Sequence, residues 1–500
     1  MTRNAARVLV LAIGAVYAWQ YRFFINPDGV AYLDLADRIR AHGWTLAVNA
    51  HWSPLLPWVL RFLNAGARYE STAAHGVAFL MFCAAFASFD YLLRELRRND
   101  AAWIAIAYAL FLWACNFAEE TGPALLTPDL LVAAELFLAS ALLVRIARGG
   151  AGWGTYAALG ASLGVSYLSK APMFPLGICI LIVAAILGGR RVVLSAALLL
   201  AIGSLYFVPL SRKLGRLSIG DSGRHNYIWR VASAGQPVHP RQLLFADPRI
   251  DGFGEARDGG TYAVHDDPGY WAEGLRPRFE VRAQLAALWS GAKVYAGVLR
   301  SPLHLALLVL LLTAIDGLAP LRWRWYLLIP AAAALAMFAA VLVEVRYVSA
   351  AIAVLWLAML VDVRLRPRVV AGVLIAVLVA ALGAPENRSE LVAVVQGAPP
   401  EDFQLAQFLA QSGVKPGDRV AFAGPGFMCY WARLAKVHLV AEAEEADELW
   451  NADDEARRAA EAALWRYGVR AFVATDAPED AGPCWRRVGG TSYSVCLGVQ

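Results

Sequence analysis

Up to residue 384, long apolar segments alternate with short polar loops. Each apolar run has about 17–25 residues, the length that an α-helix needs to cross a bilayer. The pattern predicts about eleven spans, at residues 7–24, 73–93, 101–117, 125–145, 153–169, 171–188, 192–210, 297–315, 325–343, 347–362 and 369–384. The two spans on either side of "SKAPMFP" could equally form one broken helix. We therefore expect a polytopic α-helical membrane protein.

The loops between these segments indicate an orientation. With the N-terminus inside, the inner loops are "RELRRND", "RIARGG", "GGRR", "APLRWRW" and "DVRLRPR", which are all rich in arginine. The short outer loops are acidic or nearly neutral, as expected when basic loops stay in the cytoplasm. An odd number of spans then puts the C-terminus outside, together with the loops 25–72 and 211–296. The Ala- and Arg-rich composition favours a bacterium, in which these parts lie on the periplasmic side of the inner or plasma membrane.

The residues after 384 follow a different pattern. "EDFQLAQFLAQSG" and "EARRAAEAALWRYG" predict helices, whereas "DRVAFAG" and "VRAFVAT" predict strands. Because strands alternate with helices, we expect a small α/β unit. The predicted domains are thus a transmembrane domain at 1–384 and an extracytoplasmic α/β domain at 385–500. Within the second, "CWRRVGGTSYSVC" predicts a hairpin, whose Cys484 and Cys496 could form a disulfide or remain thiols.

The composition agrees with the apolar pattern and excludes some functions. Of the 500 residues, 59% are hydrophobic and 17% are charged, and the formal net charge is +5. The mean hydropathy is +0.49. The charged fraction of 17% is lower than the roughly 25% that a soluble domain carries. The chain has no basic tract interleaved with aromatic residues, so no nucleic-acid partner is expected. The His and Cys spacing indicates no metal site. No cofactor is expected either, although a divalent cation is left open.

The stretch "INPDGVAYLDLADRI" brings three acids to the point where the first span reaches the outer side. It predicts an amphipathic helix. Asp34 and Asp37 are expected on its solvated face, with Asp37 paired with Arg40. Asp28 follows Pro27 at the start of this helix. It is either a helix cap or a functional carboxylate beside the membrane.

The chain contains several short motifs: Pro27-Asp28, Tyr32, Gly43-Trp44, Pro54-Leu55 with Trp58, "GASLGVSYLSKAP" and "EVRY". Together they resemble the GT-C superfamily of membrane glycosyltransferases, especially the branch of protein O-mannosyltransferases and lipid A aminoarabinose transferases. The resemblance covers the layout of residues 1–365. It implies a GT-C fold, a sugar donor linked to polyprenyl phosphate, and a catalytic acid at Asp28. Gly29 stands where the family commonly has a second acid.

The resemblance and the physical chemistry together suggest roles for three charged residues. Asp28 is expected to act as general base on an acceptor hydroxyl, while Lys170 and Arg346 hold the donor phosphate. Both cations lie at the outer ends of predicted spans, where an ionisable group is costly and usually functional. The alternative for Lys170 is snorkelling to the interface. For Arg346 the alternative is an ion pair with Glu344 or with the pair Glu119/Glu120.

Further candidates for substrate contacts come from both large outer loops and the span ends. In the second loop, aromatic rings suit sugar faces and polar groups suit sugar hydroxyls, although such residues also suit a loop that lies on the membrane. Asp129 could instead cap a helix, and a lone His51 could be structural. The full set is Tyr32, His51, Glu119, Asp129, Tyr227, Trp229, Asp267, Tyr270 and Trp271.

The predicted function is that of an integral-membrane glycosyltransferase. It would transfer a hexosyl or pentosyl group from a polyprenyl-phosphate donor to a lipid, glycan or protein acceptor at the outer face of the membrane. The alternatives are a transporter or flippase of lipid-linked substrates and a non-catalytic envelope assembly protein. A flippase needs broken helices, polar groups at mid-membrane and internal repeats. The sequence has few central charges and no clear repeat.

Overall fold

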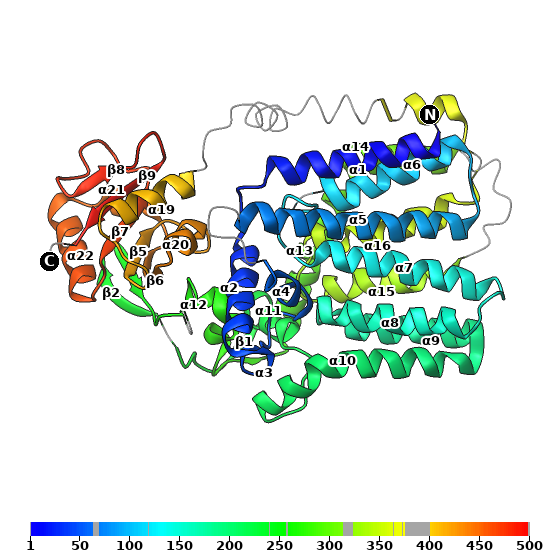
Figure 1. Ribbon diagram of the computed structural model, residues 1–500, viewed down its shortest axis with the longest axis horizontal. Coiled ribbons are helices and arrows are strands. Elements are labelled where there is room, and N and C mark those ends of the chain that lie inside the picture. The colour runs from blue at the N-terminus through cyan, green and yellow to red at the C-terminus, as the bar shows by residue number, and fades with distance from the viewer. Residues whose placement is uncertain are drawn as a thin grey trace.

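The computed structural model describes residues 2–63, 70–118, 120–239, 241–256, 259–313, 324–363, 365–372, 374–375 and 401–498. A bundle of long helices forms one part, and an α/β domain lies beyond one end of it (Figure 1). The N-terminus lies at the opposite end of the bundle (Figure 1).

Most of the predicted spans coincide with helices of the bundle, but the helix Val281–Leu299 lies almost wholly in the predicted outer loop 211–296. In chain order these helices are α1 (Arg3–Gln20), α5 (Glu70–Leu96), α6 (Ala101–Leu112) with the π-helix η1 (Trp113–Phe117), α7 (Asp129–Ala147), α8 (Trp153–Ser169), α9 (Met173–Gly188), α10 (Val192–Leu214), α13 (Val281–Leu299), α14 (Pro302–Thr313), α15 (Trp325–Ala339) and α16 (Val345–Leu360). The segment "SKAPMFP" separates two helices, α8 and α9. The predicted span 369–384 lies mainly outside the described residues.

Three described segments are long and apolar enough to cross a membrane. They are Glu70–Leu96, Asp129–Ala147 and Met173–Leu214, the last of which comprises α9, the 3-10 turn η2 (Gly189–Arg191) and α10. The helices α13 and α14, bent by 75°, form a fourth candidate if they are one broken span. The helices α6 with η1, α15 and α16 are apolar but shorter. The membrane class is thus supported, and the number of eleven spans stays a prediction.

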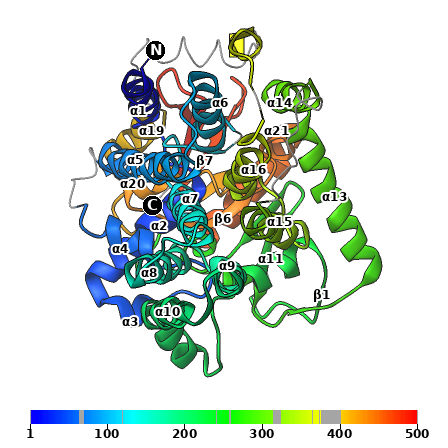
Figure 2. The same ribbon diagram turned by 90° about the vertical axis from the view of Figure 1, so that its right-hand side faces the viewer.

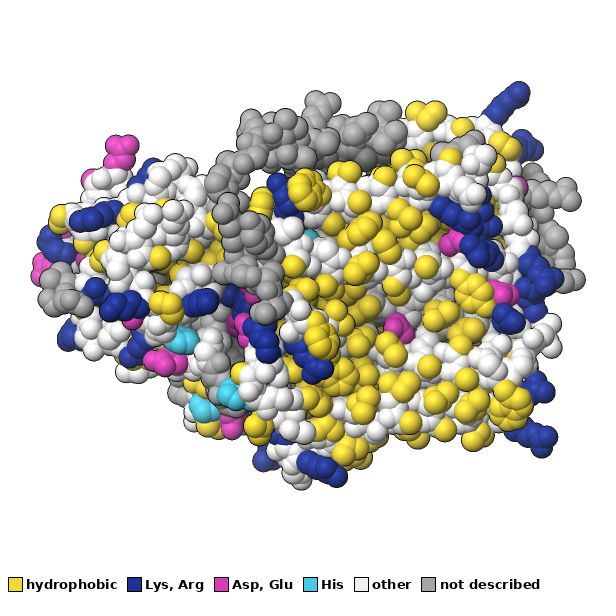
Figure 3. All heavy atoms as spheres, in the orientation of Figure 1, with side chains coloured by type: hydrophobic (Ala, Val, Ile, Leu, Met, Phe, Trp, Pro, Cys, Tyr) yellow, Lys and Arg dark blue, Asp and Glu magenta, His cyan; other side chains and the backbone are white. Residues whose placement is uncertain are grey.

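The surface of the bundle suits a bilayer. Figure 3 shows a broad apolar face over the helices, with basic side chains towards both ends. Such a belt is what a membrane-embedded bundle presents to lipid and headgroups. Within the bundle, α8 and α10 approach closely at Gly160, where an added Cβ would lie 2.4 Å from the carbonyl oxygen of Ser195. Small residues permit this close helix contact. Seen along the bundle, α7 lies near its centre and α13 at its edge (Figure 2).

A layer of short elements lies between the bundle and the α/β domain (Figure 1). It contains α2 (Pro27–His42), α3 (Trp44–Ala47), α4 (Leu55–Leu60), α11 (Ser222–Arg230), β1 (Ser233–Ala234), α12 (Ala263–Asp266), η4 (Pro268–Ala272) and β4 (Arg276–Pro277). The helix α2 begins at Pro27 and ends at His42, and it is followed by Gly43, whose φ of 80° suits glycine.

The helix α2 is predicted correctly, but its surroundings are not. Asp37 pairs with Arg40, as expected. Asp34, however, is only 7% exposed. Its carboxylate accepts hydrogen bonds from Thr261 and Arg433. The expectation that Asp34 belongs to a solvated face is therefore wrong, because the α/β domain and the second outer loop cover that side of α2.

The α/β domain is built on a seven-stranded sheet with the order β2-β3-β6-β5-β7-β9-β8. Strand β5 is parallel to β6 and β7, and the other pairs are antiparallel. The elements after the gap at 376–400 are α19 (Glu401–Gln411), β5 (Arg419–Ala423), α20 (Tyr430–Ala435), β6 (His438–Ala443), α21 (Ala446–Asn451), α22 (Asp454–Arg466), β7 (Ala471–Thr475), β8 (Trp485–Arg487) and β9 (Tyr493–Leu497). The predicted helices and strands of this domain are therefore confirmed.

Two strands of this sheet come from the second outer loop. They are β2 (Gln242–Ala246) and β3 (Arg249–Gly252), and β3 pairs with β6. The loop 211–296 is thus joined to the α/β domain. At the other edge of the sheet, β8 and β9 form the predicted hairpin, and Cys484 and Cys496 form a disulfide across it.

Candidate functional site

A cavity of about 280 Å³ lies at the end of the bundle that faces the α/β domain. Its polar wall includes Asp28, Tyr32, His51, Asp129, Lys170 and Asn226. Its lining also includes the apolar residues Met337, Phe338, Val341 and Leu342, from α15 and the residues after it. The cavity thus combines charged groups with a surface that suits a hydrocarbon chain.

The charged residues meet here because several helix ends converge. Asp28 lies in the first turn of α2, and Asp129 is the first residue of α7. Acids at helix N-termini are favoured by the helix dipole. Lys170 follows directly on the last residue of α8, and Arg346 lies in the first turn of α16.

Arg346 connects three acids. Its guanidinium donates hydrogen bonds to Asp28 and to Glu344, at 2.7 Å in each case, and it lies 3.5 Å from a carboxylate oxygen of Glu120. The predicted ion pairs of Arg346 with Glu344 and Glu120 are therefore present, and the pair with Asp28 is additional. Asp28 is one of the described residues that line the cavity, whereas Arg346 is not among them.

Lys170 and Asp129 form a second ion pair in the cavity wall. The Lys170 Nζ donates to Asp129 Oδ1 at 2.6 Å and lies 3.5 Å from the centre of the Tyr347 ring. Burial lowers the pKa of Lys170, and the charge of Asp129 opposes that shift. The ammonium group therefore lies beside a carboxylate and an aromatic face in a poorly solvated place, where an anionic ligand would interact strongly with it.

A pair of histidines forms another part of the wall. The Nδ1 atoms of His51 and His225 lie 3.3 Å apart, so one ring donates and the other accepts. The two rings are stacked, and Trp229 lies beside both. Burial, followed by the neighbouring His225, lowers the pKa of His51 to about 3. Burial also lowers the pKa of His225. Both imidazoles are therefore neutral near pH 7.

Gly29 has no room for a side chain. An added Cβ would lie 2.9 Å from the Asn26 side-chain oxygen and 2.9 Å from a methyl group of Ile25. The Asn26 oxygen is itself fixed, because it accepts a hydrogen bond of 2.9 Å from the Leu126 backbone. The departure from the family pattern at Gly29 thus has a local cause: the chain packs tightly where α2 begins.

The structure brings together three of the nine residues proposed as substrate contacts. Tyr32, His51 and Asp129 line the cavity. Glu119 lies outside the described residues. Five other candidates, all from the second outer loop, are not among the lining residues: Tyr227, Trp229, Asp267, Tyr270 and Trp271.

These five residues have partners elsewhere. The Trp229 ring is tilted against both rings of the histidine pair, and the Tyr227 hydroxyl donates to Gln284 at 3.1 Å. Asp267 caps η4 through the Gly269 amide. Tyr270 stacks on His239, and Trp271 packs against the core of the α/β domain.

Sequence reasoning missed Asn226, His225 and Tyr347 as parts of the site. Asn226 and Tyr347 line the cavity, and His225 supports His51. Helical spacing offers one signal, because Ser222 and Asn226 are four residues apart in α11 and both line the cavity.

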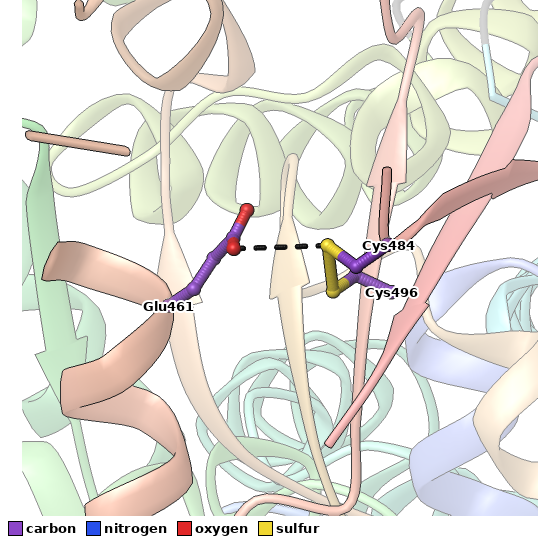
Figure 4. Close-up of side chains that lie close together, drawn as sticks. All are labelled: Glu461, Cys484 and Cys496. Atoms are coloured by element: carbon purple, nitrogen blue, oxygen red, sulfur yellow. Dashed lines mark hydrogen bonds between the residues drawn. A yellow bond between two sulfur atoms is a disulfide. The ribbon is translucent and has the colours of Figure 1, made fainter. Parts of the chain in front are cut away.

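Over the described residues, one group of His, Cys, Asp and Glu side chains lies close enough to share a metal ion. It consists of Glu461, Cys484 and Cys496 in the α/β domain (Figure 4). The two cysteines form a disulfide, and a Glu461 oxygen lies 3.6 Å from the Cys484 sulfur. Since metal binding by cysteine requires thiolates, this group is better explained as a disulfide with a neighbouring acid.

Comparison with known proteins supports the resemblance seen in the sequence. The family described as dolichyl-phosphate-mannose-protein mannosyltransferase matches residues 51–212. No curated protein sequence matches the chain. Among solved structures, ArnT from Cupriavidus metallidurans in the apo state is similar with a TM-score of 0.53 and 15% identity, over 99% of this chain and 100% of that one.

Two more structures extend the comparison. ArnT from the same organism bound to undecaprenyl phosphate gives a TM-score of 0.51 and 16% identity, over 99% of each chain. An oligosaccharyltransferase from Archaeoglobus fulgidus, in complex with Zn and sulfate, gives 0.43 and 15% identity, over 93% of this chain and 68% of that one. The last score is too low to compare the sites. The resemblance to GT-C glycosyltransferases is thus confirmed in fold with ArnT and in sequence over residues 51–212.

Proposed function

We propose that the protein is an integral-membrane glycosyltransferase that uses a sugar linked to polyprenyl phosphate. The observation that carries this proposal is the cavity itself, whose lining combines Asp28 and the Asp129–Lys170 pair with the apolar residues Met337, Phe338, Val341 and Leu342. A lipid-linked sugar phosphate needs both properties, since its chain is apolar and its phosphate is anionic. The ArnT structure with undecaprenyl phosphate is a protein of the same fold with such a lipid bound.

In the proposed reaction, Asp28 accepts the proton of an acceptor hydroxyl. The acceptor oxygen bonds to the anomeric carbon of the sugar, and the bond from that carbon to the phosphate oxygen breaks. The electron pair leaves with the polyprenyl phosphate, whose charge is stabilised by Lys170. Tyr32, His51 and Asn226 line the same space and are proposed to contact the sugar or the acceptor.

We expected Arg346 to bind the donor phosphate, and its contacts favour another role. Its guanidinium is bonded to Asp28 and Glu344 and lies behind the cavity wall. We therefore propose that Arg346 orients the Asp28 carboxylate. It could contact the donor phosphate only after its hydrogen bond to Asp28 or to Glu344 had broken. Lys170 is then the main cation for the leaving group.

We further propose that the reaction takes place at the periplasmic face of a bacterial inner membrane, with the N-terminus in the cytoplasm. Support comes from the arginine-rich inner loops and from the cavity at the end of the bundle opposite to the N-terminus. Hexosyl and pentosyl donors both remain candidates, as do lipid, glycan and protein acceptors.

The test is transfer by the purified protein in proteoliposomes that contain a radiolabelled polyprenyl-phosphate sugar. The expected result is movement of label to an acceptor from envelope extracts, with release of polyprenyl phosphate. Movement of the intact labelled lipid across the bilayer, without cleavage, would instead show a flippase. A protein that neither cleaves nor moves the lipid would be an assembly factor.

A further inference from the structure

The α/β domain provides no residue among those that line the cavity, yet it is bonded to the helix that carries Asp28. The contact is made by Arg433, in the last turn of α20. Its side chain is only 9% exposed, and its guanidinium donates to Asp34 of α2, to Asp37 of α2 at 2.7 Å and to Glu70 of α5 at 2.6 Å. One arginine of the α/β domain thus binds two helices of the membrane part.

Asp34 is also held from a second direction. The Thr261 backbone amide and hydroxyl donate to its carboxylate at 2.7 and 3.1 Å. The carbonyl oxygen of Thr261 accepts a hydrogen bond of 2.9 Å from the amide of Leu439, in strand β6. Asp34 is therefore bound both by helix α20 of the α/β domain and by a loop residue that is bonded to strand β6.

The charge balance at this point depends on Arg433. Three carboxylates approach one another here and share the Arg433 guanidinium, while Arg40 also pairs with Asp37. Arginine suits this role because its planar group offers five N–H donors in a fixed geometry. Without Arg433, the buried Asp34 and the neighbouring Glu70 would repel each other and lose a buried counter-charge. The expected consequence is a shift of α2 relative to α5.

A shift of α2 would be transmitted to the cavity. Asp28 and Asp34 lie in the same continuous helix, about 9 Å apart along its axis at roughly 1.5 Å per residue. We propose that Arg433 is a positioning residue: by docking the α/β domain on α2, it fixes the Asp28 carboxylate in the cavity. This inference rests on the proposed function of Asp28.

The proposal predicts different effects on kcat and on the KM for the sugar donor. The cation proposed for the donor phosphate, Lys170, follows α8, and its partner Asp129 begins α7. Arg433 contacts neither helix in its three ion pairs. Loss of Arg433 should therefore impair the step that needs the base and leave donor binding intact.

The experiment uses the full-length protein in proteoliposomes and compares Arg433→Ala, Arg433→Lys and Arg457→Ala. Arg457 is the matched control, because its side chain is also 9% exposed and its partner, Asp454, lies in its own helix α22. Two quantities are measured: kcat and KM for the polyprenyl-phosphate sugar, and the amide hydrogen exchange of residues 27–42. The hydrogen-exchange measurement does not depend on which reaction the protein catalyses.

Arg433→Ala is expected to lower kcat about 100-fold, as a misplaced catalytic group does, with an unchanged donor KM and faster exchange in α2. Arg433→Lys should restore part of kcat, and Arg457→Ala should match the wild type. Unchanged kcat and exchange in Arg433→Ala would overturn the proposal, as would faster exchange throughout the bundle or a loss confined to donor KM. If the wild type transfers no sugar, the proposed function fails, while the exchange in α2 still decides whether Arg433 fixes this helix.

Discussion

Arg346 donates a hydrogen bond of 2.7 Å to Asp28, although the two residues are 318 positions apart in the chain. The pair connects the first turn of α2 to the first turn of α16. A charge-assisted bond of this kind fixes the direction of a carboxylate. The pair therefore explains how an acid that follows the first predicted span obtains one defined position at the cavity.

Replacement of the proposed base should abolish transfer without unfolding the protein. In Asp28→Asn the side chain keeps its shape but accepts no proton, so kcat is expected to fall about 10²- to 10⁴-fold. The measurement is transfer of label in proteoliposomes, with melting followed by tryptophan fluorescence. Asp251→Asn is a suitable control, because Asp251 also pairs with an arginine, at 3.0 Å, but lies in strand β3. Near-normal transfer by Asp28→Asn would exclude its role as base.

Loss of Lys170 should weaken donor binding. A hydrogen bond to a charged group contributes about 1.5–3 kcal/mol, which corresponds to about 10- to 100-fold in affinity. Lys170→Ala alone leaves Asp129 buried without its cation, so the double variant Lys170→Ala with Asp129→Asn separates folding from binding. The double variant should melt nearer to the wild type and still bind polyprenyl phosphate weakly. Lys213→Ala serves as control, since Lys213 binds the Val48 carbonyl and does not line the cavity. Equal losses in the Lys213 and Lys170 variants would contradict a specific phosphate contact.

Arg346 should affect catalysis more than donor affinity. In Arg346→Lys a single ammonium replaces a guanidinium that serves both Asp28 and Glu344. We expect kcat to fall at least 10-fold, about the size of effects from misplaced groups, with a smaller change in donor KM than in Lys170→Ala. The two kinetic constants are measured under the same conditions for both variants. A larger rise in KM for Arg346→Lys would favour direct phosphate binding by Arg346.

The proposed reaction is a single displacement, so the anomeric configuration should invert. Asp28 acts on the acceptor, and no covalent sugar–enzyme intermediate is formed, as in other inverting transfers with a general base. The configuration of donor and product is compared by NMR of the released sugar linkage. Retention would require a nucleophilic carboxylate and would remove Asp28 from its role as base.

The neutral histidine pair predicts lower stability in mild acid. The pKa of His51 is about 3 in the folded protein, whereas an unfolded chain binds a proton near pH 6.5. The stabilisation is therefore complete above pH 6.5 and is lost progressively as the pH falls from 6.5 towards 3. The melting temperature should drop between pH 7.5 and pH 5.5, and His51→Asn should reduce that drop. An equal drop in the variant would assign it to other groups, such as His225 and His265, whose pKa values burial also lowers.

Local sequence locates the helix ends that carry three residues of the cavity wall, while their roles stay predictions. Asp28, Asp129 and Lys170 stand at the ends of apolar runs, and hydropathy alone locates those ends. The same is true of the helices and strands of the α/β domain, whose periodic patterns have clear stops. Local patterns do not show which helix ends lie close together in space, and only the structure shows this.

The second outer loop could not be placed from sequence, because long-range contacts fix its path. Thr261 bonds to Asp34, 227 positions away, and Arg433 bonds to the same acid from 399 positions away. For that reason Asp34 was assigned to a solvated face, and the aromatic residues Tyr270 and Trp271 were expected near substrate. Their composition was suitable, but the sheet of the α/β domain determines where they lie.

The hairpin formed by β2 and β3 also sets an order of assembly. Its partner strand β6 (His438–Ala443) follows β3 (Arg249–Gly252) by almost 200 residues, so β3 has an unpaired edge until that later strand has been made. The loop 211–296, which contributes Ser222 and Asn226 to the cavity wall, therefore lacks this strand contact until residues 438–443 have been made. In a chain truncated before β6, the edge of β3 would be open to pairing with other strands.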